Sequence, residues 1–363
     1  MEKKIGLVTW HYYSNFGSLL QAYALQTILI DLGYSSEFIN YRKIKFKSSK
    51  LKTAIKYFAS YLSIILPKQY REMYSFRFIK FQYDFLKQSK RTYSAETLKK
   101  YNSKYDIFIC GSDQIWAPNV FDPVYLLSFV DDNKPKISYA PSIGLDSIPI
   151  SLHDIYRELL NRFDSLSVRE EKGAEILKTL FEINAEIVLD PTLLKKEIWE
   201  EIVIKPKIND EYIFCYFLGK NKSHREIVKK IAKKLNYKII TISNFLTDDD
   251  LSDYIDKFAG PREFLGYVNN AKLIFTDSFH GAAFSINFNK QFYVFERFSI
   301  DDQICQNSRI YNLLAKVGLQ NRIIKYNQSF EETEDIEFAN VNLLLSKEKE
   351  KSMDYLKNSL KKW

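Results

Sequence analysis

The fragment Thr276–Gly281, TDSFHG, contains the residues of this chain best suited to chemistry. It lies between an apolar run that reads as a buried strand and a stretch that reads as a helix start. A strand, a polar turn and a helix direct backbone N–H groups and a positive helix dipole at an anion. His280 on such a turn can donate to a phosphate or carboxylate and can move protons. The structural alternative is that Ser278 or Asp277 merely caps the helix and His280 bonds a local carbonyl.

A second set of polar residues follows the strand-like run 106–110. In an open parallel sheet, ligands gather beyond the carboxyl ends of the strands. A glycine there permits close backbone approach, serine and aspartate offer polar contacts, and an indole offers an apolar face for a sugar. The candidates are Ser112, Asp113, Gln114 and Trp116. An ordinary turn with an aspartate cap and a core tryptophan is the alternative.

The turn after the first expected strand should face the same edge of the sheet. It offers Asn15, Gly17 and Gln21 as candidate contacts, while Asn15 or Ser18 could serve only as a helix cap. Neither turn has the spacing of a Walker loop, and no G-x-G-x-x-G follows the first strand. A nucleotide fold of the dehydrogenase type is therefore disfavoured.

Two arginines stand at the ends of expected elements. Arg169 closes a strand-like run, where a guanidinium can grip phosphate or carboxylate in a bidentate manner, or can form a surface ion pair with a neighbouring glutamate. Arg309 opens a helix and is the second candidate. His153 and His224 are expected to be solvated. No nucleophile–histidine–acid order and no metal-ligand spacing is readable, so neither a metal nor a bound cofactor is expected.

The apolar runs predict an α/β fold with two doubly wound, Rossmann-like domains. Residues 4–41 read as strand, helix and strand, with Gly33 at the helix C-terminus, which is one βαβ unit. A helix is expected over residues 155–162. A second series of alternations begins after residue 192 and includes an expected helix over 223–235 and an expected strand over 273–276. We predict an N-terminal domain over residues 1–190, a C-terminal domain over 191–325, and an acidic loop with a C-terminal helix over 326–363.

Residues 42–100 break that rhythm and predict a basic helical insertion in the first domain. They carry sixteen Lys and Arg against three Asp and Glu, a balance of +13, whereas the whole chain carries +8. The segment is either a solvated hairpin that packs on the domain or a surface that approaches anionic lipid or a lipid-linked substrate. No nucleic-acid readout motif accompanies the charge, so nucleic acid is not expected as a partner.

The composition is that of a soluble globular protein, with 46% hydrophobic and 27% charged residues. A length of 363 residues favours two domains. The three cysteines are far apart and form neither a disulfide framework nor a zinc site. We see no signal peptide and no membrane-spanning run. The expected location is the cytoplasm, with peripheral contact at the inner face of the membrane if the insertion binds lipid.

A series of short strings extends over roughly residues 5–320. The strings are Asn15-Phe16-Gly17, Leu20 to Gln26, Gly111 to Trp116, Ser138-Tyr139-Ala140, Ser167 to Glu170, Asp190-Pro191-Thr192, Gly260-Pro261 with Glu263-Phe264, Ser278 to Gly281, and Ser308-Arg309-Ile310. In this order they resemble the polysaccharide pyruvyl transferase family. Each string is short, but the ordered set is fairly specific to that family.

This resemblance implies a two-domain fold like that of the GT-B glycosyltransferases, with the active site between the domains. It implies that phosphoenolpyruvate is the donor co-substrate and that two hydroxyls of a sugar accept a ketal-linked pyruvate. The acceptor would be a bacterial surface polysaccharide, such as an exopolysaccharide or capsule, or its lipid-linked precursor. The first domain would serve the acceptor and the second the donor.

The resemblance also implies roles for the candidate residues. His280 would be the general acid and base, and Asp113 would position or deprotonate an acceptor hydroxyl. Better-known members have an arginine where this chain has Ser278, so another arginine must supply the charge, or the donor differs. The donor contacts would be Arg169, Arg309, Asp277, Ser278 and Gly281, and the acceptor contacts Asn15, Gly17, Gln21, Ser112, Gln114 and Trp116.

Two other functions remain open at this point. One is a glycosyltransferase that uses a nucleotide sugar, for which Glu296, after an expected strand, is the one candidate ribose contact. The other is a non-catalytic scaffold of polysaccharide synthesis, held at the membrane by residues 42–100.

Overall fold

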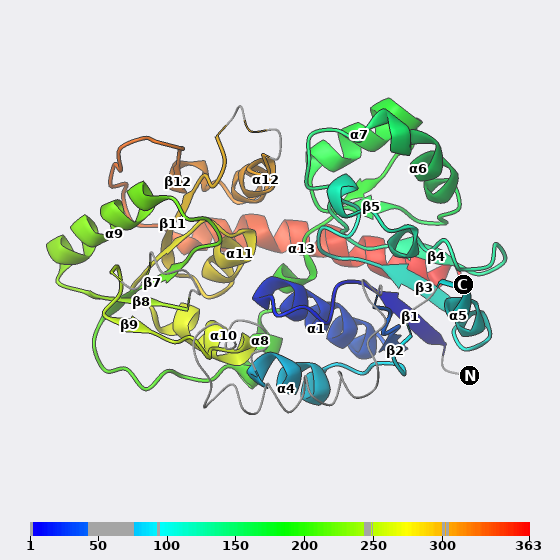
Figure 1. The fold of residues 1–363 in the computed structure, drawn as a ribbon, viewed down its shortest axis with the longest axis horizontal. Coiled ribbons are helices and arrows are strands. Elements are labelled where there is room, and N and C mark those ends of the chain that lie inside the picture. The colour runs from blue at the N-terminus through cyan, green and yellow to red at the C-terminus, as the bar shows by residue number, and fades with distance from the viewer. Residues whose placement is uncertain are drawn as a thin grey trace. The chain divides into compact units, whose positions relative to one another are not determined.

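The computed structural model describes residues 3–42, 76–92, 95–242, 248, 250–299, 302 and 305–363. The chain divides into two compact units, each with its own sheet (Figure 1). Most of the predicted insertion, residues 43–75, lies outside the described residues. Unit 1 comprises Met1–Ile143, Ser147–Pro191 and Asp354–Trp363, and unit 2 comprises Gly144–Asp146 and Thr192–Met353.

The sheet of unit 1 is parallel and has the strand order β2-β1-β3-β4. A bridge between Ile137 and Ser165 continues it toward the parallel pair β5-β6. The strands of unit 1 are β1 (Lys4–Val8), β2 (Ser35–Phe38), β3 (Ile107–Cys110), β4 (Lys136–Ser138), β5 (Ser167–Val168) and β6 (Glu186–Ile187). Its α-helices are α1 (Phe16–Asp31), α4 (Phe76–Phe85), α5 (Ala95–Leu98), α6 (His153–Leu160) and α7 (Glu171–Phe181). Short 3₁₀ turns connect them at η1 (Lys99–Ser103), η2 (Pro118–Val120), η3 (Pro123–Leu126) and η4 (Ile150–Leu152).

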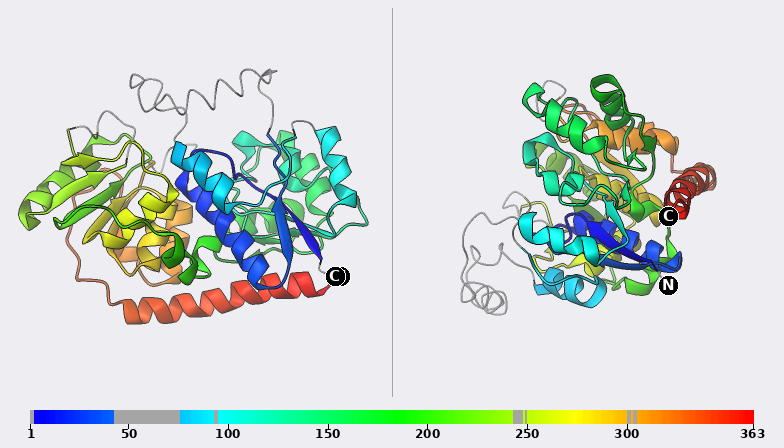
Figure 2. Two further views of the ribbon diagram at one scale, coloured as in Figure 1. Left: turned by 90° about the horizontal axis from the view of Figure 1, so that it is seen from below. Right: turned by 90° about the vertical axis from the view of Figure 1, so that its right-hand side faces the viewer.

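Helix α1 begins and ends where its sequence requires. The Asn15 side chain accepts a hydrogen bond from Ser18 N at 3.0 Å, which satisfies one of the free N–H groups of the first turn. After the last turn, Gly33 adopts φ 86°, the left-handed conformation that ends helices at little cost for glycine. Figure 2 shows α1 lying along the sheet of unit 1.

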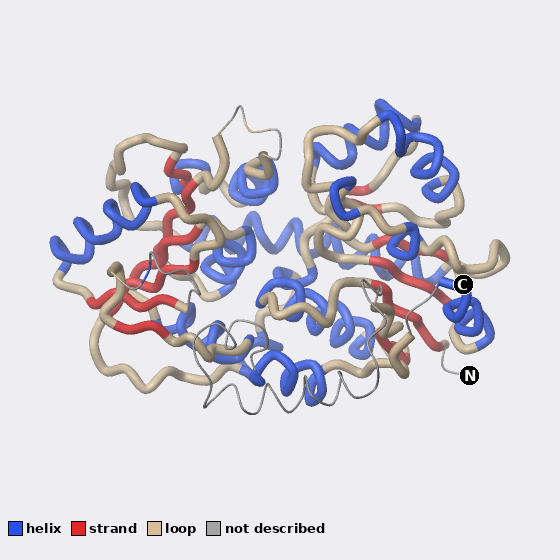
Figure 3. The backbone as a smooth tube through the Cα atoms, in the orientation of Figure 1, coloured by secondary structure: helices blue, strands red, loops and turns tan. Residues whose placement is uncertain are grey.

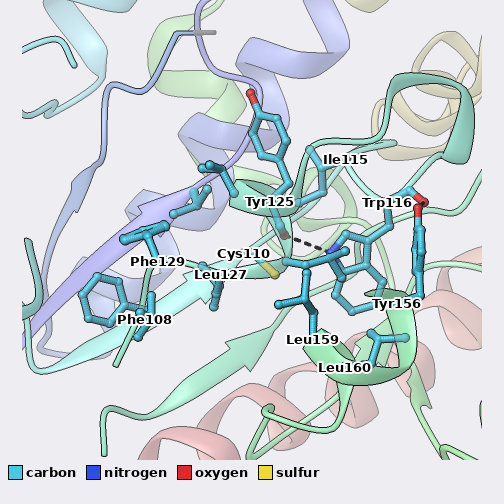
Figure 4. Packing of buried hydrophobic residues seen from close by; sticks show 14 of the residues in the cluster. Phe108, Cys110, Ile115, Trp116, Tyr125, Leu127, Phe129, Tyr156, Leu159 and Leu160 are labelled. Carbon is cyan, nitrogen blue, oxygen red and sulfur yellow. Dashed lines mark hydrogen bonds between the residues drawn. The ribbon is translucent and has the colours of Figure 1, made fainter. Parts of the chain in front are cut away.

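The core of unit 1 is rich in aromatic side chains (Figure 4). Trp116, Tyr156 and Phe108 are all at most 1% exposed, and they pack with leucines and isoleucines of the same cluster. The Trp116 indole donates to Tyr125 O at 3.0 Å, so its one polar group is satisfied inside the core. Part of the aromatic content of the chain therefore serves this core.

The sheet of unit 2 is also parallel, with the order β12-β11-β10-β7-β8-β9. This is the order of the dinucleotide-binding sheets, which reverses between β7 and β10. The strands are β7 (Tyr212–Tyr216), β8 (Lys238–Thr241), β9 (Tyr254–Ile255), β10 (Leu273–Thr276), β11 (Gln291–Phe295) and β12 (Ile323–Ile324). The helices are α8 (Glu197–Ile202), α9 (Lys222–Leu235), α10 (Pro261–Asn270), α11 (Phe279–Asn287) and α12 (Ser308–Lys316), with the turn η7 (Gln320–Arg322). The turn η5 (Pro191–Leu193) lies at the unit boundary, and α13 (Phe338–Lys361) has residues in both units.

The predicted α/β class with two doubly wound parallel sheets is confirmed. Figure 3 shows the strands gathered into a sheet within each unit, with helices around them. The expected strand at residues 273–276 is β10 with the same bounds, and the expected helix at 223–235 is α9. None of the helices in the described ranges combines the length and the apolar character needed to cross a bilayer.

Candidate functional site

The strand order of the sheet in unit 1 reverses between β1 and β3. A network of buried hydrogen bonds lies at the carboxyl ends of these two strands. Thr9 Oγ1 donates to Ser112 O at 3.0 Å, and Gln21 Oε1 accepts from Ser112 N at 2.9 Å. Gln21 Nε2 donates to Ser18 O at 2.8 Å and lies 3.2 Å from Thr9 Oγ1. Gln21 and Ser112 are fully buried. The structure therefore places these two predicted acceptor contacts in bonds that tie α1 to the turn after β3.

Asp113 follows this network in an unusual backbone conformation. Its φ of 73° lies in the left-handed region, which is uncommon for a non-glycine residue. Its carboxylate accepts from Ser18 Oγ at 2.5 Å and from Gln114 N at 2.9 Å. The turn can form because Gly111, at φ 120°, has no side chain: a Cβ there would lie 2.0 Å from Tyr139 O. The turn therefore fixes one carboxylate at the carboxyl edge of the sheet.

Arg169 lies in a buried ion cluster. Its Nη1 donates to Asp190 Oδ2 at 2.8 Å, and its Nε lies 3.8 Å from Glu170 Oε2. The three side chains are at most 4% exposed. Burial alone would lower the pKa of Arg169, but the carboxylates of Asp190 and Glu170 raise it above its usual range. Arg169 thus neutralises carboxylates of its own chain, and the alternative of a surface ion pair is wrong because these side chains are buried. Its role as a donor contact stays a prediction.

The remaining acceptor candidates of unit 1 occupy different environments. Trp116 is a core residue with 1% exposure, so the prediction that its indole face packs on a sugar is wrong. Gly17 is buried within α1, and Asn15 is exposed with its side chain engaged as the helix cap. Gln114 is half-buried. Of these four, Asn15 and Gln114 are the ones that retain accessible surface.

In unit 2, Asp277 follows β10 and closes the turn after β7. Its Oδ1 accepts from Leu218 N at 2.6 Å and its Oδ2 from Gly219 N at 2.8 Å. Burial raises the pKa of Asp277, although these two N–H groups, Arg297 and Arg225 oppose the shift. Gly219 is needed here, because a Cβ would lie 2.9 Å from Asp277 Oδ2. Asp277, predicted as a donor contact, is thus already bound to the backbone of the turn after β7.

The start of α11 has the capping that the sequence suggested as the structural alternative. Ser278 is the N-cap residue, and its Oγ accepts from Gly281 N at 3.4 Å. Thr276 Oγ1 donates to Tyr216 O at 2.7 Å and accepts from Ser278 N at 3.1 Å. Gly281 packs so closely that a Cβ would lie 2.3 Å from Thr276 Oγ1. Ser278 and Gly281 therefore shape the turn that carries His280.

His280 lies in the first turn of α11, directly beyond the carboxyl end of β10. It is 9% exposed, and its ring meets that of Phe279 edge to face at 5.2 Å. A histidine at a helix N-terminus and at the point where a parallel sheet reverses its order is well placed to meet an anionic ligand.

Arg297 is a functional candidate that the sequence reasoning missed. It comes two residues after β11, and its Nη2 lies 3.3 Å from Gln306 Oε1. Arg309 Nη2 donates to the same oxygen at 2.8 Å. Two guanidinium groups thus meet at one neutral amide oxygen. Burial lowers the pKa of Arg297, with Asp277 and Tyr216 opposing the shift. The signal was available in the sequence, because an arginine at a strand's carboxyl end was the reason for choosing Arg169.

A further arginine lies at the start of α9. Arg225 is 4% exposed, donates from Nε to Asp248 Oδ1 at 2.9 Å, and covers the Phe217 ring at 4.5 Å. Its neighbour His224, expected to be solvated, is 2% exposed and stacks on Phe295 at 4.2 Å. Burial, together with Arg225, lowers the pKa of His224 to about 4. The expectation for His224 was wrong because the apolar faces of the sheet and helix enclose it.

Two other expectations concern ligands of the site. Glu296, the ribose candidate of the nucleotide-sugar alternative, already accepts from Tyr311 OH and, at 2.7 Å, from Tyr326 N. Within the described residues, no group of three or more His, Cys, Asp or Glu side chains could hold a metal ion.

Comparison with known structures gives similar proteins over nearly the whole chain but at low identity. UDP-GlcNAc 2-epimerase from Neisseria meningitidis is 12% identical, with coverage of 98% of this chain and 94% of that chain and a TM-score of 0.48. The enzyme of the same name from Methanocaldococcus jannaschii is 12% identical, with coverage of 95% and 92% and a TM-score of 0.48. An E. coli heptosyltransferase is 10% identical, with coverage of 95% and 99% and a TM-score of 0.40. These values carry no argument about activity.

Sequence comparison is more specific. No curated protein matches the chain. The family described as polysaccharide pyruvyl transferase matches residues 15–297, which include the turns at Asp113, Asp277 and His280 and the cation Arg297. This match covers well over half of the chain, and the chain belongs to the polysaccharide pyruvyl transferase family.

Proposed function

We propose that this protein transfers pyruvate from phosphoenolpyruvate to a sugar and forms a pyruvate ketal. The acceptor is a bacterial surface polysaccharide or its lipid-linked precursor, and the reaction takes place in the cytoplasm. Membership of the family supports the transfer to a polysaccharide. Peripheral contact with an anionic membrane through residues 42–100 stays a prediction, because most of that segment lies outside the described residues.

The single observation that carries the choice of donor is the meeting of Arg297 and Arg309 at Gln306 Oε1. Phosphoenolpyruvate has a carboxylate and a phosphate, so its site needs several cationic or N–H donors. Gln306 contributes no charge, and the Asp277 carboxylate, which acts to raise the pKa of Arg297, also accepts from two backbone N–H groups. A small dianion would therefore meet two guanidinium groups that converge on one amide oxygen.

His280 supplies the proton transfer in this proposal. A proton passes to the methylene carbon of phosphoenolpyruvate, and the adjacent carbon becomes oxocarbenium-like. One sugar hydroxyl attacks that carbon and loses its proton. The carbon–oxygen bond to phosphate then breaks, phosphate leaves, and the second hydroxyl attacks and loses its proton to close the ketal. A histidine suits both directions of proton transfer near neutral pH.

On unit 1, we assign the acceptor contacts to Asp113 and Gln114, in the turn after β3, and to Asn15, in the turn after β1. The support is the position of these residues at the reversal point of the sheet and the left-handed backbone of Asp113. The carboxylate of Asp113 would accept a hydrogen bond from a sugar hydroxyl and orient it for attack.

Isothermal titration calorimetry with phosphoenolpyruvate tests the donor site. Arg297→Gln and Arg309→Gln should each weaken binding about 10- to 100-fold, because each removes one charge-assisted contact. Arg77→Gln, on an exposed position of α4, is the matched control and should bind like the parent. Unchanged binding in both site variants, or tighter binding of a nucleotide sugar than of phosphoenolpyruvate, would contradict the proposal.

The reaction itself is tested by weighing the products formed from phosphoenolpyruvate and candidate lipid-linked oligosaccharides. The product should gain the mass of one pyruvate less one water. His280→Asn should keep donor binding and lose transfer, since the amide keeps polarity but cannot exchange protons near neutral pH. Transfer at the parental rate by His280→Asn would remove histidine from the mechanism.

A further inference from the structure

An aromatic turn follows β1 and presents rings to the solvent. It consists of Trp10, Tyr12 and Tyr13, which we call the aromatic turn. Tyr13 is 46% exposed, and Trp10 and Tyr12 are half-buried. His11, which lies between Trp10 and Tyr12 in the sequence, is buried. Trp10, Tyr12 and Tyr13 thus keep accessible surface, whereas His11 has none.

The three rings are held against one another. Trp10 meets Tyr13 edge to face at 5.8 Å, and Tyr12 lies 4.3 Å from Tyr13. Tyr12 OH donates to Tyr13 OH at 3.0 Å. The buried Tyr125 also contacts Trp10 edge to face, with ring centroids 6.2 Å apart. The arrangement is a supported surface of rings, which would cost little further ordering when a ligand binds.

Polar groups border this surface. The Arg42 guanidinium lies 4.9 Å over the Tyr12 ring. Burial and the contact with Tyr12 raise the pKa of Tyr13, and the charge of Asp122 adds to this shift. The Asp122 carboxylate is itself buried and accepts from Tyr41 OH and Val124 N, both at 3.1 Å. Two phenol hydroxyls and one guanidinium therefore border an apolar ring surface. This is the combination of an apolar face with a few placed polar groups that small-molecule sites show.

The position of the aromatic turn adds to its chemistry. Trp10 comes two residues after Val8, the last residue of β1, and the order of the sheet reverses between β1 and β3. Ligands of open α/β sheets bind at this edge. Trp116 was the ring expected to contact a sugar at this edge, but it lies in the core. Another ring would therefore have to make that contact.

We infer that the aromatic turn binds a hexopyranose ring of the acceptor glycan. The C–H face of such a ring is apolar and packs on Trp10 and Tyr13, while its hydroxyls bond to the polar border of Arg42 and the phenols. A polysaccharide acceptor is what the family of this chain acts on, so a sugar is favoured over a nucleobase or a lipid tail. The inference rests on the proposed function for the identity of the ligand.

Fluorine NMR of protein labelled with 5-fluorotryptophan tests this directly. The chain has four tryptophans, so the spectrum has few signals. Trp116 and Trp199 are buried, and Trp363, which is 45% exposed, is a built-in control for solvent effects. Methyl β-D-galactopyranoside, methyl β-D-glucopyranoside and methyl α-D-mannopyranoside at tens of millimolar are the probes. We expect the Trp10 signal, assigned with Trp10→Phe, to shift with at least one probe while the Trp363 signal does not.

Two variants then measure the contribution of the rings. Trp10→Ala and Tyr13→Ala should each weaken binding of the responding sugar about tenfold. Tyr254→Ala is the matched control, because Tyr254 is 48% exposed on unit 2 and should leave sugar affinity unchanged. Trp10→Ala lacks the fluorine signal that reports binding. The affinities of all variants are therefore taken from saturation-transfer spectra of the sugar.

The outcomes separate this inference from the proposed function. Sugar binding that depends on Trp10 and Tyr13, in a protein that does not bind phosphoenolpyruvate, would keep the aromatic turn and overturn the donor. A Trp10 signal that no pyranoside shifts, or variants that bind the sugar as tightly as the parent, would overturn the aromatic turn and leave phosphoenolpyruvate binding by unit 2 untouched.

Discussion

Mild acid should destabilise unit 1 through the single buried imidazole of His11. Its Nδ1 lies 3.0 Å from Thr9 O, and because a carbonyl only accepts, Nδ1 carries the proton of the neutral ring. Nε2 is buried and finds no hydrogen-bond partner in the described part of the chain. The ring stacks on Phe38 at 4.9 Å. A second proton on Nε2 would place a buried charge with no acceptor.

The size of this effect follows from the pKa. Burial lowers the pKa of His11 from 6.5 to about 4; the Thr9 carbonyl opposes this shift and Arg42 adds to it. Between these values the unfolded chain binds a proton that the folded chain does not. Stability is therefore unaffected by this group above about pH 6.5 and falls as the pH drops from there to about 4. At pH 5 the loss amounts to about 2 kcal/mol.

Carbon-13 NMR of labelled histidines and urea unfolding check the two halves of this prediction. The His11 signal, assigned with His11→Phe, should keep the shift of a neutral ring down to about pH 5. His11→Phe retains a ring against Phe38 and removes the titrating group, so the unfolding midpoint of unit 1 should fall less on acidification than in the parent. A His11 signal that titrates near its ordinary pKa, or an equal loss of stability in both proteins, would refute the reasoning.

Three further predictions concern folding and reactivity. Asp190→Asn should cost about 3–5 kcal/mol in urea unfolding, because it leaves the buried guanidinium of Arg169 without its 2.8 Å carboxylate partner; a loss below about 1 kcal/mol would show that the pair is not needed. Gly281→Ala should lower the melting temperature, since its Cβ would lie 2.3 Å from Thr276 Oγ1, and Thr276→Ala in the same chain should restore part of the loss. A thiol reagent should label one cysteine of the native protein, the half-buried Cys305, and all three after unfolding; fast labelling of a second thiol would contradict the burial that raises the pKa of the other two.

The periodicity of apolar residues was sufficient to predict most strands and helices. β10 has the predicted bounds, and α6 and α9 differ from the prediction by one or two residues at their ends. The reason is that parallel strands covered on both faces are continuous apolar runs, which turn residues separate clearly from amphipathic helices. What periodicity could not give is which strands are neighbours, and so the reversal points became visible only in the structure.

The site was less predictable, because residue type does not reveal partners. Arg169 and Arg297 both follow strands, yet one neutralises Asp190 and the other lies against an uncharged glutamine. Trp116 has the same indole as Trp10, but the first belongs to the core and the second is accessible. In each case the difference arises from contacts between residues far apart in the sequence, which no local motif records.

The bond between Asp277 and the amides of Leu218 and Gly219 has a consequence for what unit 2 can recognise. Sheets with this strand order usually offer such main-chain nitrogens to the diphosphate of a coenzyme. Here the carboxylate of Asp277 accepts from these nitrogens, so they are not available to a diphosphate. An anionic ligand would have to bind the cationic side chains of Arg297 and Arg309 instead, and these suit a small metabolite better than a long coenzyme.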